Sequence, residues 1–352
     1  MQRLARAAIT VLAGFLACAP ATAADDFSFE GETLRVVVPY PPGGGTTLTG
    51  QFFARWLGRH VDGGPTAQVV NIEGAGGVIG SNEYALSYPH DGLSVLLGST
   101  ALFLVREEGV RFDPRDFEPL ASVPAGNVAY VRADTGVRTP ADLANPAKPL
   151  HFAASRPSGG DLIRAFALTL LEAPITINYG YDGRGPARIA FEQGEASIDV
   201  QTTPTYLKNV VPLVDEGTAV PLFSFGIVED GRIVRDPAFP DLPHVGEVYQ
   251  ALHGKAPEGA AWDTYTFMIA AGVNGAKVIW AHGDAPAGAL DKLRAGVRSM
   301  STDPDFIAEG KDELGGYDLN FGDSLRATVA VALNPSDEVV RTIGEFIASQ
   351  NQ

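Results

Sequence analysis

The chain has 352 residues, a formal net charge of −16 and 19% charged residues. This length is enough for two domains of ordinary size, and the acidic balance argues against nucleic acid or an anionic lipid surface as a partner. A small anion is not excluded, because backbone dipoles hold a carboxylate locally whatever the global charge. The only cysteine, Cys18, lies in the N-terminal segment, so the rest of the chain offers no disulfide, catalytic thiol or cysteine metal ligand.

The first 24 residues have the pattern of a secretory signal peptide. Two arginines precede an apolar run over Ala7–Ala19, and Ala21-Thr22-Ala23 supplies the small residues that signal peptidase reads. The surroundings of Cys18 match a lipoprotein signal poorly, so ordinary cleavage after Ala23 or Ala24 is favoured. We expect an exported mature chain of 328 residues with charge −18, since this segment of 24 residues removes two arginines and no acid.

A strand, a glycine-rich turn and a helix begin the mature sequence. Leu34–Val38 is an apolar, β-branched run typical of a buried strand, and the prolines and glycines of Pro41–Gly45 force a sharp turn. Apolar residues then recur at helical spacing over Leu48–Leu57, with Thr46 or Thr47 as the expected cap. The free amides of such a turn and the helix dipole attract an anion, whether phosphate, carboxylate or dinucleotide, although the turn can also be a plain tight connection.

A second glycine-rich turn, Glu73–Gly80, joins a strand at Val69–Ile72 to a helix near Ser81–Leu86. Its spacing, Gly-x-Gly-x-x-x-Gly, is not that of a dinucleotide site, and no acid ends the following strand where one is expected. We interpret it as a turn that lets the helix pack closely against the sheet. Further on, Ser99 and Thr100 follow the end of another strand, where they either face a pocket or cap a short helix.

The middle of the chain repeats the arrangement. Val128–Val131 is the expected first strand of a second domain, and the strand Leu150–Ala154 leads through a serine- and glycine-rich turn into a helix. Gln201 and Thr202 follow a buried strand and are plausible cleft contacts, while the preceding acid, Asp199, is better suited to orienting or capping than to catalysis.

The later elements complete an alternation of strands and helices. We expect strands at Ile175–Tyr179, Leu222–Phe225, Thr264–Ala270 and Val278–Ala281, a helix opened by Pro286, and a last helix behind Ser336. The pattern predicts an α/β protein that leaves its first domain, builds a second, and returns near Ala251–Trp262.

Five strings in the chain are distinctive: Val38-Pro39-Tyr40-Pro41-Pro42-Gly43-Gly44-Gly45-Thr46, Gly74-Ala75-Gly76-Gly77-Val78-Ile79-Gly80, Pro89-His90-Asp91-Gly92, Leu96-Leu97-Gly98-Ser99, and the Tyr181, Gly183, Pro186 and Ala187 of a Tyr-x-Gly-x-x-Pro-Ala pattern. They resemble strings of the substrate-binding proteins of tripartite tricarboxylate transporters, the Bug or TctC family of periplasmic receptors. The resemblance is strongest over residues 34–124 and weakest in the last hundred residues.

The resemblance implies a two-domain periplasmic-binding-protein fold of type II, the venus-flytrap architecture, with mixed sheets and a hinge. Domain I would comprise residues 25–124 and 256–352, and domain II residues 125–255. It further implies a periplasmic receptor, with no cofactor and no metal, that captures a small organic anion such as a carboxylate and passes it to the membrane components of the transporter. A monomer is the default expectation.

In such a receptor, turns from both domains hold the ligand between them with amides and hydroxyls. The candidate ligand-binding residues are Tyr40, Pro41, Gly44, Gly45, Thr46, Thr47, Ser99, Thr100, Ser155, Arg156, Ser158, Gly159, Gly183, Arg184, Gln201 and Thr202. Ser158 is equally suited to capping a helix. Arg156 either pairs with a ligand carboxylate or lies in solvent, and Arg184 is by default an ordinary helix-start residue.

Two departures from the family pattern suggest a non-standard ligand. Thr47 stands where the family usually has an aspartate, and Arg156 brings charge into a turn that is commonly small and polar. The sequence does not name the solute. An exported α/β enzyme acting on a small organic acid is the alternative, but the six histidines lack metal-ligand spacing and there is no Gly-x-Ser-x-Gly elbow.

Overall fold

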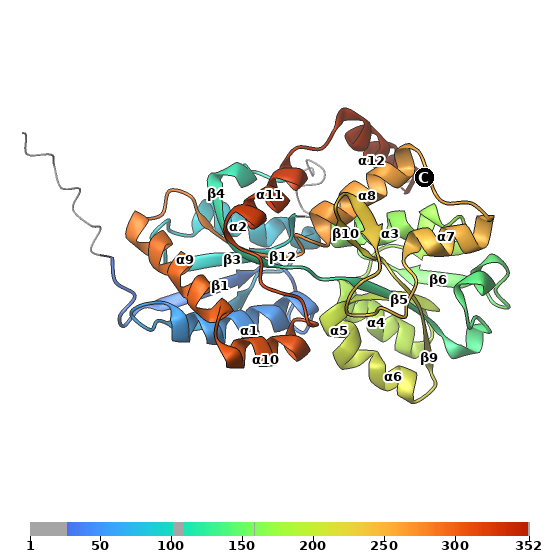
Figure 1. Cartoon of the computed structure of the whole chain (residues 1–352), viewed down its shortest axis with the longest axis horizontal. Helices are drawn as coiled ribbons and strands as arrows, with labels where there is room; N and C mark the ends of the chain where they lie inside the picture. Colours follow the sequence, from blue (N-terminus) through green and yellow to red (C-terminus); the bar gives the residue numbers. More distant parts are fainter. Residues whose placement is uncertain (1–26, 101–108, 158, 351–352) are drawn as a thin grey trace, which may run out of the picture.

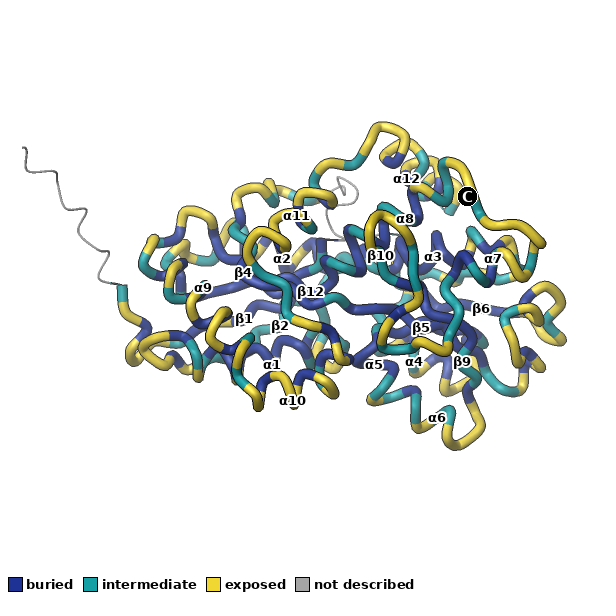
Figure 2. The backbone as a smooth tube through the Cα atoms, in the orientation of Figure 1, coloured by how far each residue is buried: buried dark blue, intermediate teal, exposed yellow. Residues whose placement is uncertain are grey.

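A computed structural model describes residues 27–100, 109–157 and 159–350. The expected signal peptide with Cys18, and the candidate residue Ser158, lie outside the described residues. The chain forms two lobes side by side along the long axis of the molecule (Figure 1), each built on a five-stranded mixed sheet. The central strands β3, β12, β8 and β5 have no exposed residue, and most exposed residues lie on the outer helices, loops and edge strands (Figure 2). The predicted α/β fold with two mixed sheets is therefore confirmed.

The first sheet has the strand order β2-β1-β3-β12-β4. Its strands are β1 (Thr33–Val38), β2 (Thr66–Asn71), β3 (Ser94–Gly98), β4 (Phe117–Val123) and β12 (Lys277–His282). β1 pairs in parallel with β2 and β3, whereas β12 runs antiparallel to both β3 and β4. β12 thus comes from the far end of the chain and lies between two strands of the N-terminal segment.

The second sheet has the order β7-β6-β8-β5-β9 and repeats the same plan. Its strands are β5 (Asn127–Arg132), β6 (Leu150–Ala153), β7 (Ile175–Asn178), β8 (Ile198–Thr202) and β9 (Ala219–Ser224), and a hairpin of β10 (Ile227–Glu229) and β11 (Arg232–Val234) follows. β6 is parallel to its neighbours β7 and β8, and β5 is antiparallel to β8 and β9. β5 therefore holds in this sheet the place that β12 holds in the first.

Helices cover both faces of each sheet. They are α1 (Gly45–His60), α2 (Val78–Ser87), α3 (Gly159–Leu170), α4 (Arg184–Gln193), α5 (Thr203–Asn209), α6 (Val211–Asp215), α7 (Val245–His253), α8 (Ala260–Gly272), α9 (Ala287–Ser301), α10 (Pro304–Glu313), α11 (Gly322–Leu333) and α12 (Asp337–Gln350). Short 3₁₀ helices span Ala75–Gly77, Pro114–Asp116, Ala133–Thr135 and Pro140–Ala144. Among the described helices, none combines the length and the apolar character needed to span a membrane.

The side chains of β1 point alternately to the two faces of the sheet, so this strand contributes to two hydrophobic cores. Val36 and Val38 point into the core shared with α1, α9 and α10, while Val37 points into the core shared with α2 and α11. Burial of this apolar surface on both faces is the main contribution to the stability of such a sheet. The continuous apolar run seen in the sequence is the expected pattern for a strand covered on both sides.

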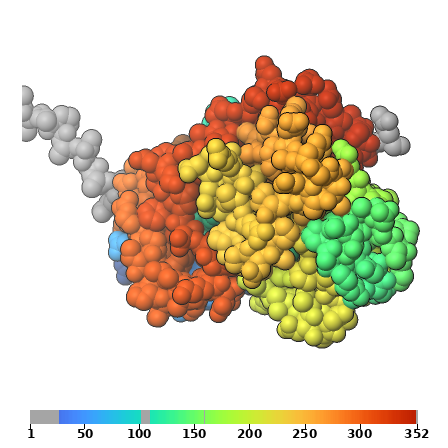
Figure 3. All heavy atoms as spheres, turned by 45° about the vertical axis from the view of Figure 1, so that its right-hand side comes forward, coloured from blue at the N-terminus to red at the C-terminus, as the bar shows by residue number. Residues whose placement is uncertain are grey.

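Two chain segments connect the lobes beside the cleft. The first runs from β4 to β5, and the second runs from α8 to β12; the amide of Ala125 donates to the carbonyl of Val273 at 3.1 Å, so the two lie side by side. A third connection joins α11 to α12, and in Figure 3 this C-terminal segment, in dark red, runs over the top of the molecule.

The predicted strand at Thr264–Ala270 is wrong: these residues belong to helix α8. Its threonine and aromatic residues favour a strand locally, but Tyr265, Met268 and Ile269 recur at helical spacing and are buried in the core of the second lobe. Because α8 and α12 pack in that core, the return crossing follows Val273 rather than falling near Ala251–Trp262. The domain bounds remain a proposal, and this packing favours assigning residues 256–273 and 337–350 to domain II.

Candidate functional site

A cavity of about 560 Å³ lies between the lobes. Its walls are the turn before α1, the turn before α2, the start of α3, the turn before α4, the end of β8, and the segment that enters β12. These are the strand–turn–helix connections singled out in the sequence, now from both halves of the molecule. A volume of this size fits a small organic molecule together with water.

Most of the predicted binding residues meet in this cavity. Those that line it are Tyr40, Pro41, Gly44, Gly45, Thr46, Ser99, Ser155, Arg156, Gly183, Arg184, Gln201 and Thr202. Thr47, Thr100 and Gly159 are buried and do not line it. Thr100 instead donates its hydroxyl to the carbonyl of Gly275 at 3.1 Å and to that of Ala271, so it ties the end of β3 to the crossing segment.

The turn before α1 and the first residues of the helix line the cavity. The helix begins at Gly45 with Gly44 as its cap residue, so the expectation that Thr46 or Thr47 caps it is wrong. Thr47 lies in the first turn, where its hydroxyl donates to the carbonyl of Pro41 at 3.1 Å and accepts from Asn71 Nδ2 at 2.8 Å. Threonine thus fixes the shape of the turn from behind, leaving the first amides of α1 without a side-chain cap.

The two lobes approach closely beside this turn. A Cβ atom added to Gly45 would lie 2.6 Å from Thr205 Oγ1 and 2.8 Å from Thr202 Oγ1, both in the second lobe. A Cβ atom added to Gly183 would lie 3.6 Å from the Pro41 ring. A side chain at position 45 would therefore have to displace Thr202 and Thr205 of the second lobe.

Buried ion pairs hold the second-lobe wall of the cavity together. Arg184 donates to the carbonyl of Ala153 at 2.7 Å and pairs with Asp199, which is fully buried. A second buried acid, Asp161, lies 3.7 Å from Arg184 and 3.1 Å from Arg164. Burial would raise the pKa of Asp161, but the arginines outweigh it and the pKa lies below its ordinary value. Arg184 therefore lines the cavity, yet its guanidinium is already paired.

Ser155 and Gln201 of this wall are bonded to the two buried acids. Asp161 Oδ2 accepts from the amide and the hydroxyl of Ser155, at 2.7 and 2.9 Å. Gln201 donates to Asp199 Oδ2 at 2.9 Å and to the carbonyl of Arg184 at 3.0 Å. Asp199 thus has the orienting role expected for it. Burial lowers the pKa of Arg184 to about 10, with Asp161 opposing the shift.

Lys277 and Asn127 also line the cavity, and the sequence analysis missed both. Each is the first residue of the strand that enters a sheet from the other lobe, β12 and β5 respectively. Lys277 is 7% exposed and its ammonium contacts the hydroxyl of Thr46. Burial, and then the nearby charge of Arg164, lower the pKa of Lys277 to about 7. The sequence signal that could have identified Lys277 and Asn127 is a polar residue at the first position of a strand that follows a crossing between the lobes.

The structure also bears on two alternatives from the sequence. Arg156 is exposed and lines the cavity at its edge, a position that fits both pairing with a ligand carboxylate and contact with solvent. The turn before α2 is a close-packing device, as interpreted: a Cβ atom added to Gly80 would lie 2.3 Å from the carbonyl oxygen of Ile72. Gly74–Gly77 of that turn form part of the cavity wall.

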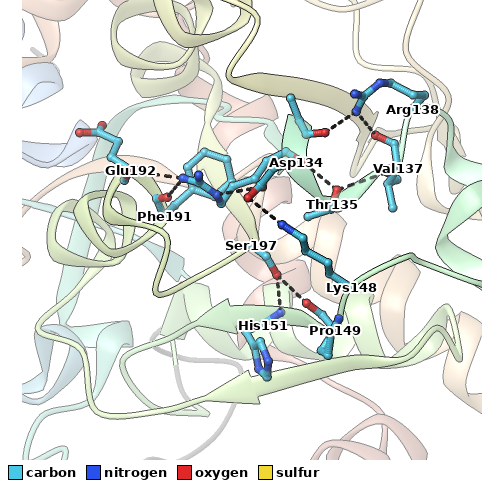
Figure 4. A network of polar contacts seen from close by, with 12 residues as sticks. Asp134, Thr135, Val137, Arg138, Lys148, Pro149, His151, Phe191, Glu192 and Ser197 are labelled. Carbon is cyan, nitrogen blue, oxygen red and sulfur yellow. Dashed lines mark hydrogen bonds and ion pairs between the residues drawn. The ribbon is translucent and has the colours of Figure 1, made fainter.

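A second hollow, of about 260 Å³, lies at the edge of the second lobe. Figure 4 shows its polar groups bonded to one another: Lys148 pairs with Asp134 at 3.1 Å, and Ser197 bonds to the backbone of His151 and Pro149. Arg132 also pairs with Asp134, at 3.1 Å. These contacts join the loops around β5, β6 and β8, which is a structural role.

One group of potential metal ligands occurs among the described residues. Ligand atoms of His90, His282 and Asp284 lie within 4.8 Å of one another. The two imidazole rings are stacked, with centroids 3.7 Å apart and planes 17° apart, and His90 already bonds to Asp284 at 2.7 Å. A metal ion lies in the plane of each imidazole that binds it, so two stacked rings do not present their nitrogens to one ion.

The chain is similar in sequence to two curated proteins. It is 27% identical over 305 residues to a UPF0065 protein in the tcbD-tcbE intergenic region of Pseudomonas sp. strain P51, covering 82% of this chain and 79% of that protein. It is also 27% identical to protein BugT of Bordetella pertussis over 234 residues, covering 62% of this chain and 67% of BugT. No family model matches the chain.

The fold is similar to the folds of several solved proteins, one of which is a periplasmic binding protein. The periplasmic binding protein BugD has a TM-score of 0.64 at 22% identity, covering 91% of this chain and 98% of its own. Rpa4515 of R. palustris with adipate has a TM-score of 0.66 at 20% identity, with 89% and 98% covered. MatC of Rhodopseudomonas palustris with bound malate has a TM-score of 0.60 at 19% identity, with 90% and 99% covered.

The fold is therefore that of a periplasmic binding protein, with two mixed sheets and a cavity between two lobes. The resemblance to the Bug receptors, first seen in the glycine-rich turns, is confirmed by the similarity to BugT in sequence and to BugD in fold.

Proposed function

We propose that this protein is a periplasmic receptor that binds a small organic anion through a carboxylate in the cavity between its lobes. The observation that carries the proposal is the convergence of amide-rich turns from both lobes, with the buried Lys277, on one cavity. Helix N-termini and their free amides favour anions. Solved proteins of the same fold contain malate and adipate, which makes small carboxylic acids the first compounds to test.

The proposal extends to location and partners. The N-terminal signal sequence would export the chain to the periplasm, where the receptor would work as a monomer. Closure of the lobes over the ligand would present the occupied form to the membrane components of a tripartite tricarboxylate-type transporter. No catalytic step is required, because binding and closure are sufficient for delivery.

A thermal-shift screen over organic acids, followed by calorimetric titration and a turnover assay, tests this function. We expect at least one acid to raise the melting temperature and to bind with a stoichiometry of one, without being consumed. Turnover of that acid by the purified protein would instead favour an exported enzyme. Absence of binding across mono-, di- and tricarboxylic acids would contradict the receptor.

A further inference from the structure

Lys277 is a buried cation whose environment lacks an acid. It belongs to the first lobe, is 7% exposed, and its one bonded partner among the described residues is the hydroxyl of Thr46. An ammonium group has three donors and no acceptor, and a buried charge without a counter-ion is costly. Two of its donors therefore lack an acceptor in the described part of the protein.

Arg164 faces the same cavity from the second lobe. It is 6% exposed, and one of its terminal nitrogens lies 3.1 Å from Asp161 Oδ1. Its Nε has no partner among the described residues. Gly160 leaves the room for this guanidinium, because a Cβ atom added there would lie 2.8 Å from Arg164 Nη1.

The two buried acids near these cations already pair with or accept hydrogen bonds from other groups. Asp161 accepts from Ser155 and pairs with two arginines, while Asp199 accepts from Arg184, Tyr130 and Gln201. When Lys277 is protonated, the buried charged groups in and behind the cavity wall are three cations (Lys277, Arg164 and Arg184) and two carboxylates. The charged form of Lys277 therefore lacks one negative charge, in a cavity that the first residues of α1 also line.

We propose that Lys277 and Arg164, one from each lobe, together bind a carboxylate of the ligand beside the amide turn of α1. This inference rests on the proposed function, since it names the two side chains that would bind the carboxylate of the proposed ligand. The site would demand an acid and reject the matching neutral amide, because an amide leaves both cations without a counter-ion. Closure brings two like charges together, so the anion between them stabilises the closed form.

Binding would then be coupled to proton uptake. The pKa of Lys277 is about 7 without a ligand, and a bound carboxylate favours the charged form. The charged groups that share the cavity with it are Glu73, Arg156, Asp161, Arg164, Asp182 and Arg184. Carboxylates and guanidinium groups ordinarily titrate outside pH 6–9, and no histidine lines the cavity in the described part of the chain. Lys277 is thus the group that would take up the proton.

The test compares acids with amides on three proteins. The acids are malate, adipate, hexanoate and benzoate, and each is compared with the neutral compound in which every carboxylate is replaced by a primary amide. All are titrated by calorimetry into the wild type, Lys277→Met and Lys292→Met. Methionine matches the length of the lysine stem, and Lys292 is a control because it is a partly exposed residue of α9 that pairs with Asp62 at 2.8 Å. Titrations at pH 8 in HEPES and in Tris, which differ in ionisation enthalpy, measure proton uptake.

We expect the wild type to bind at least one acid, to bind its amide roughly a hundredfold more weakly, and to take up close to one proton per ligand at pH 8. Lys277→Met should lose roughly tenfold to a hundredfold in affinity for the acid and should take up no proton, while Lys292→Met matches the wild type. Equal binding of acid and amide, or an unchanged Lys277→Met, would overturn the inference and leave the receptor intact. If no acid or amide binds, the receptor and the inference both fail.

Discussion

A single glycine sets how closely the lobes approach. Gly45 begins α1 and faces Thr202 and Thr205 of the other lobe at distances that leave no room for a side chain. We expect Gly45→Val to weaken ligand binding at least tenfold while the melting temperature of the unliganded protein stays near that of the wild type. Calorimetry measures the first and a thermal scan the second. Gly344→Val, on the exposed side of α12, is the control for the substitution itself; wild-type affinity in Gly45→Val would contradict this role.

We predict that Arg184, through its buried ion pairs, stabilises the folded protein. Arg184→Met would leave Asp199 and Asp161 buried with fewer partners, which typically costs about 3–5 kcal/mol in the free energy of unfolding. Arg188→Met removes a nearby partly exposed pair with Glu192 and should cost at most about 1 kcal/mol. Urea unfolding of the two variants distinguishes them, and equal losses would show that the buried ion pairs are not what holds this wall.

Because the pKa of Lys277 is lowered in the folded protein, we expect the free energy of unfolding to depend on pH in an unusual way. Its pKa is about 7 in the folded protein against an ordinary value of 10.5, so the unfolded chain binds the proton more tightly. The burial cost is complete below pH 7 and disappears as the pH rises toward 10.5. Lys277→Met should therefore be more stable than the wild type at pH 6, by up to about 5 kcal/mol in the free energy of unfolding, and this gain should shrink toward pH 10. A gain that is constant with pH would contradict the shifted pKa.

At the scale of elements, a buried polar network lies at the first crossing segment between the lobes. The hydroxyl of Tyr317 donates to Asp236, lies 2.9 Å from the Thr203 hydroxyl, and accepts from the amide of Gly126 at 3.2 Å. Gly126 is in the first crossing segment, and an added Cβ atom there would meet this Asp236 carboxylate. The network connects the loop between α10 and α11 to the start of α5.

Removing the central hydroxyl tests that network. Tyr317→Phe removes a hydrogen-bond donor from the buried carboxylate of Asp236. This loss should lower the free energy of unfolding by about 1–3 kcal/mol. Urea denaturation measures the loss. Tyr249→Phe on α7 is a matched control outside the network, and a Tyr317→Phe variant as stable as this control would mean that the hydroxyl contributes little.

The elements differed in how well the sequence predicted them. β1, β3 and β12 were clear because continuous apolar runs mark strands buried on both faces. α8 was mistaken for a strand because its threonine and aromatic residues fit a strand locally, and only its packing within the second-lobe core selects the helix. The crossing after Val273 could not be located from sequence for the same reason.

At the scale of the whole molecule, the sequence predicted the turns but not the charges between them. Glycine and proline mark a turn locally, so the walls of the cavity could be found in the chain. Lys277 and Arg164 are ordinary residues in their own segments, and they line one cavity only because the fold places the starts of β12 and α3 on its two sides. Contacts of this kind arise from topology, which single-sequence patterns do not specify.

The most direct test is a crystal structure of the protein with the best-binding acid from the screen. A ligand held by both lobes is the central claim, since a ligand that contacts one lobe cannot favour closure. We predict the acid in the cavity, with its carboxylate beside Lys277 and the first amides of α1 and with contacts to the second lobe. An acid that binds outside this cavity, or that touches residues of one lobe alone, would contradict the account.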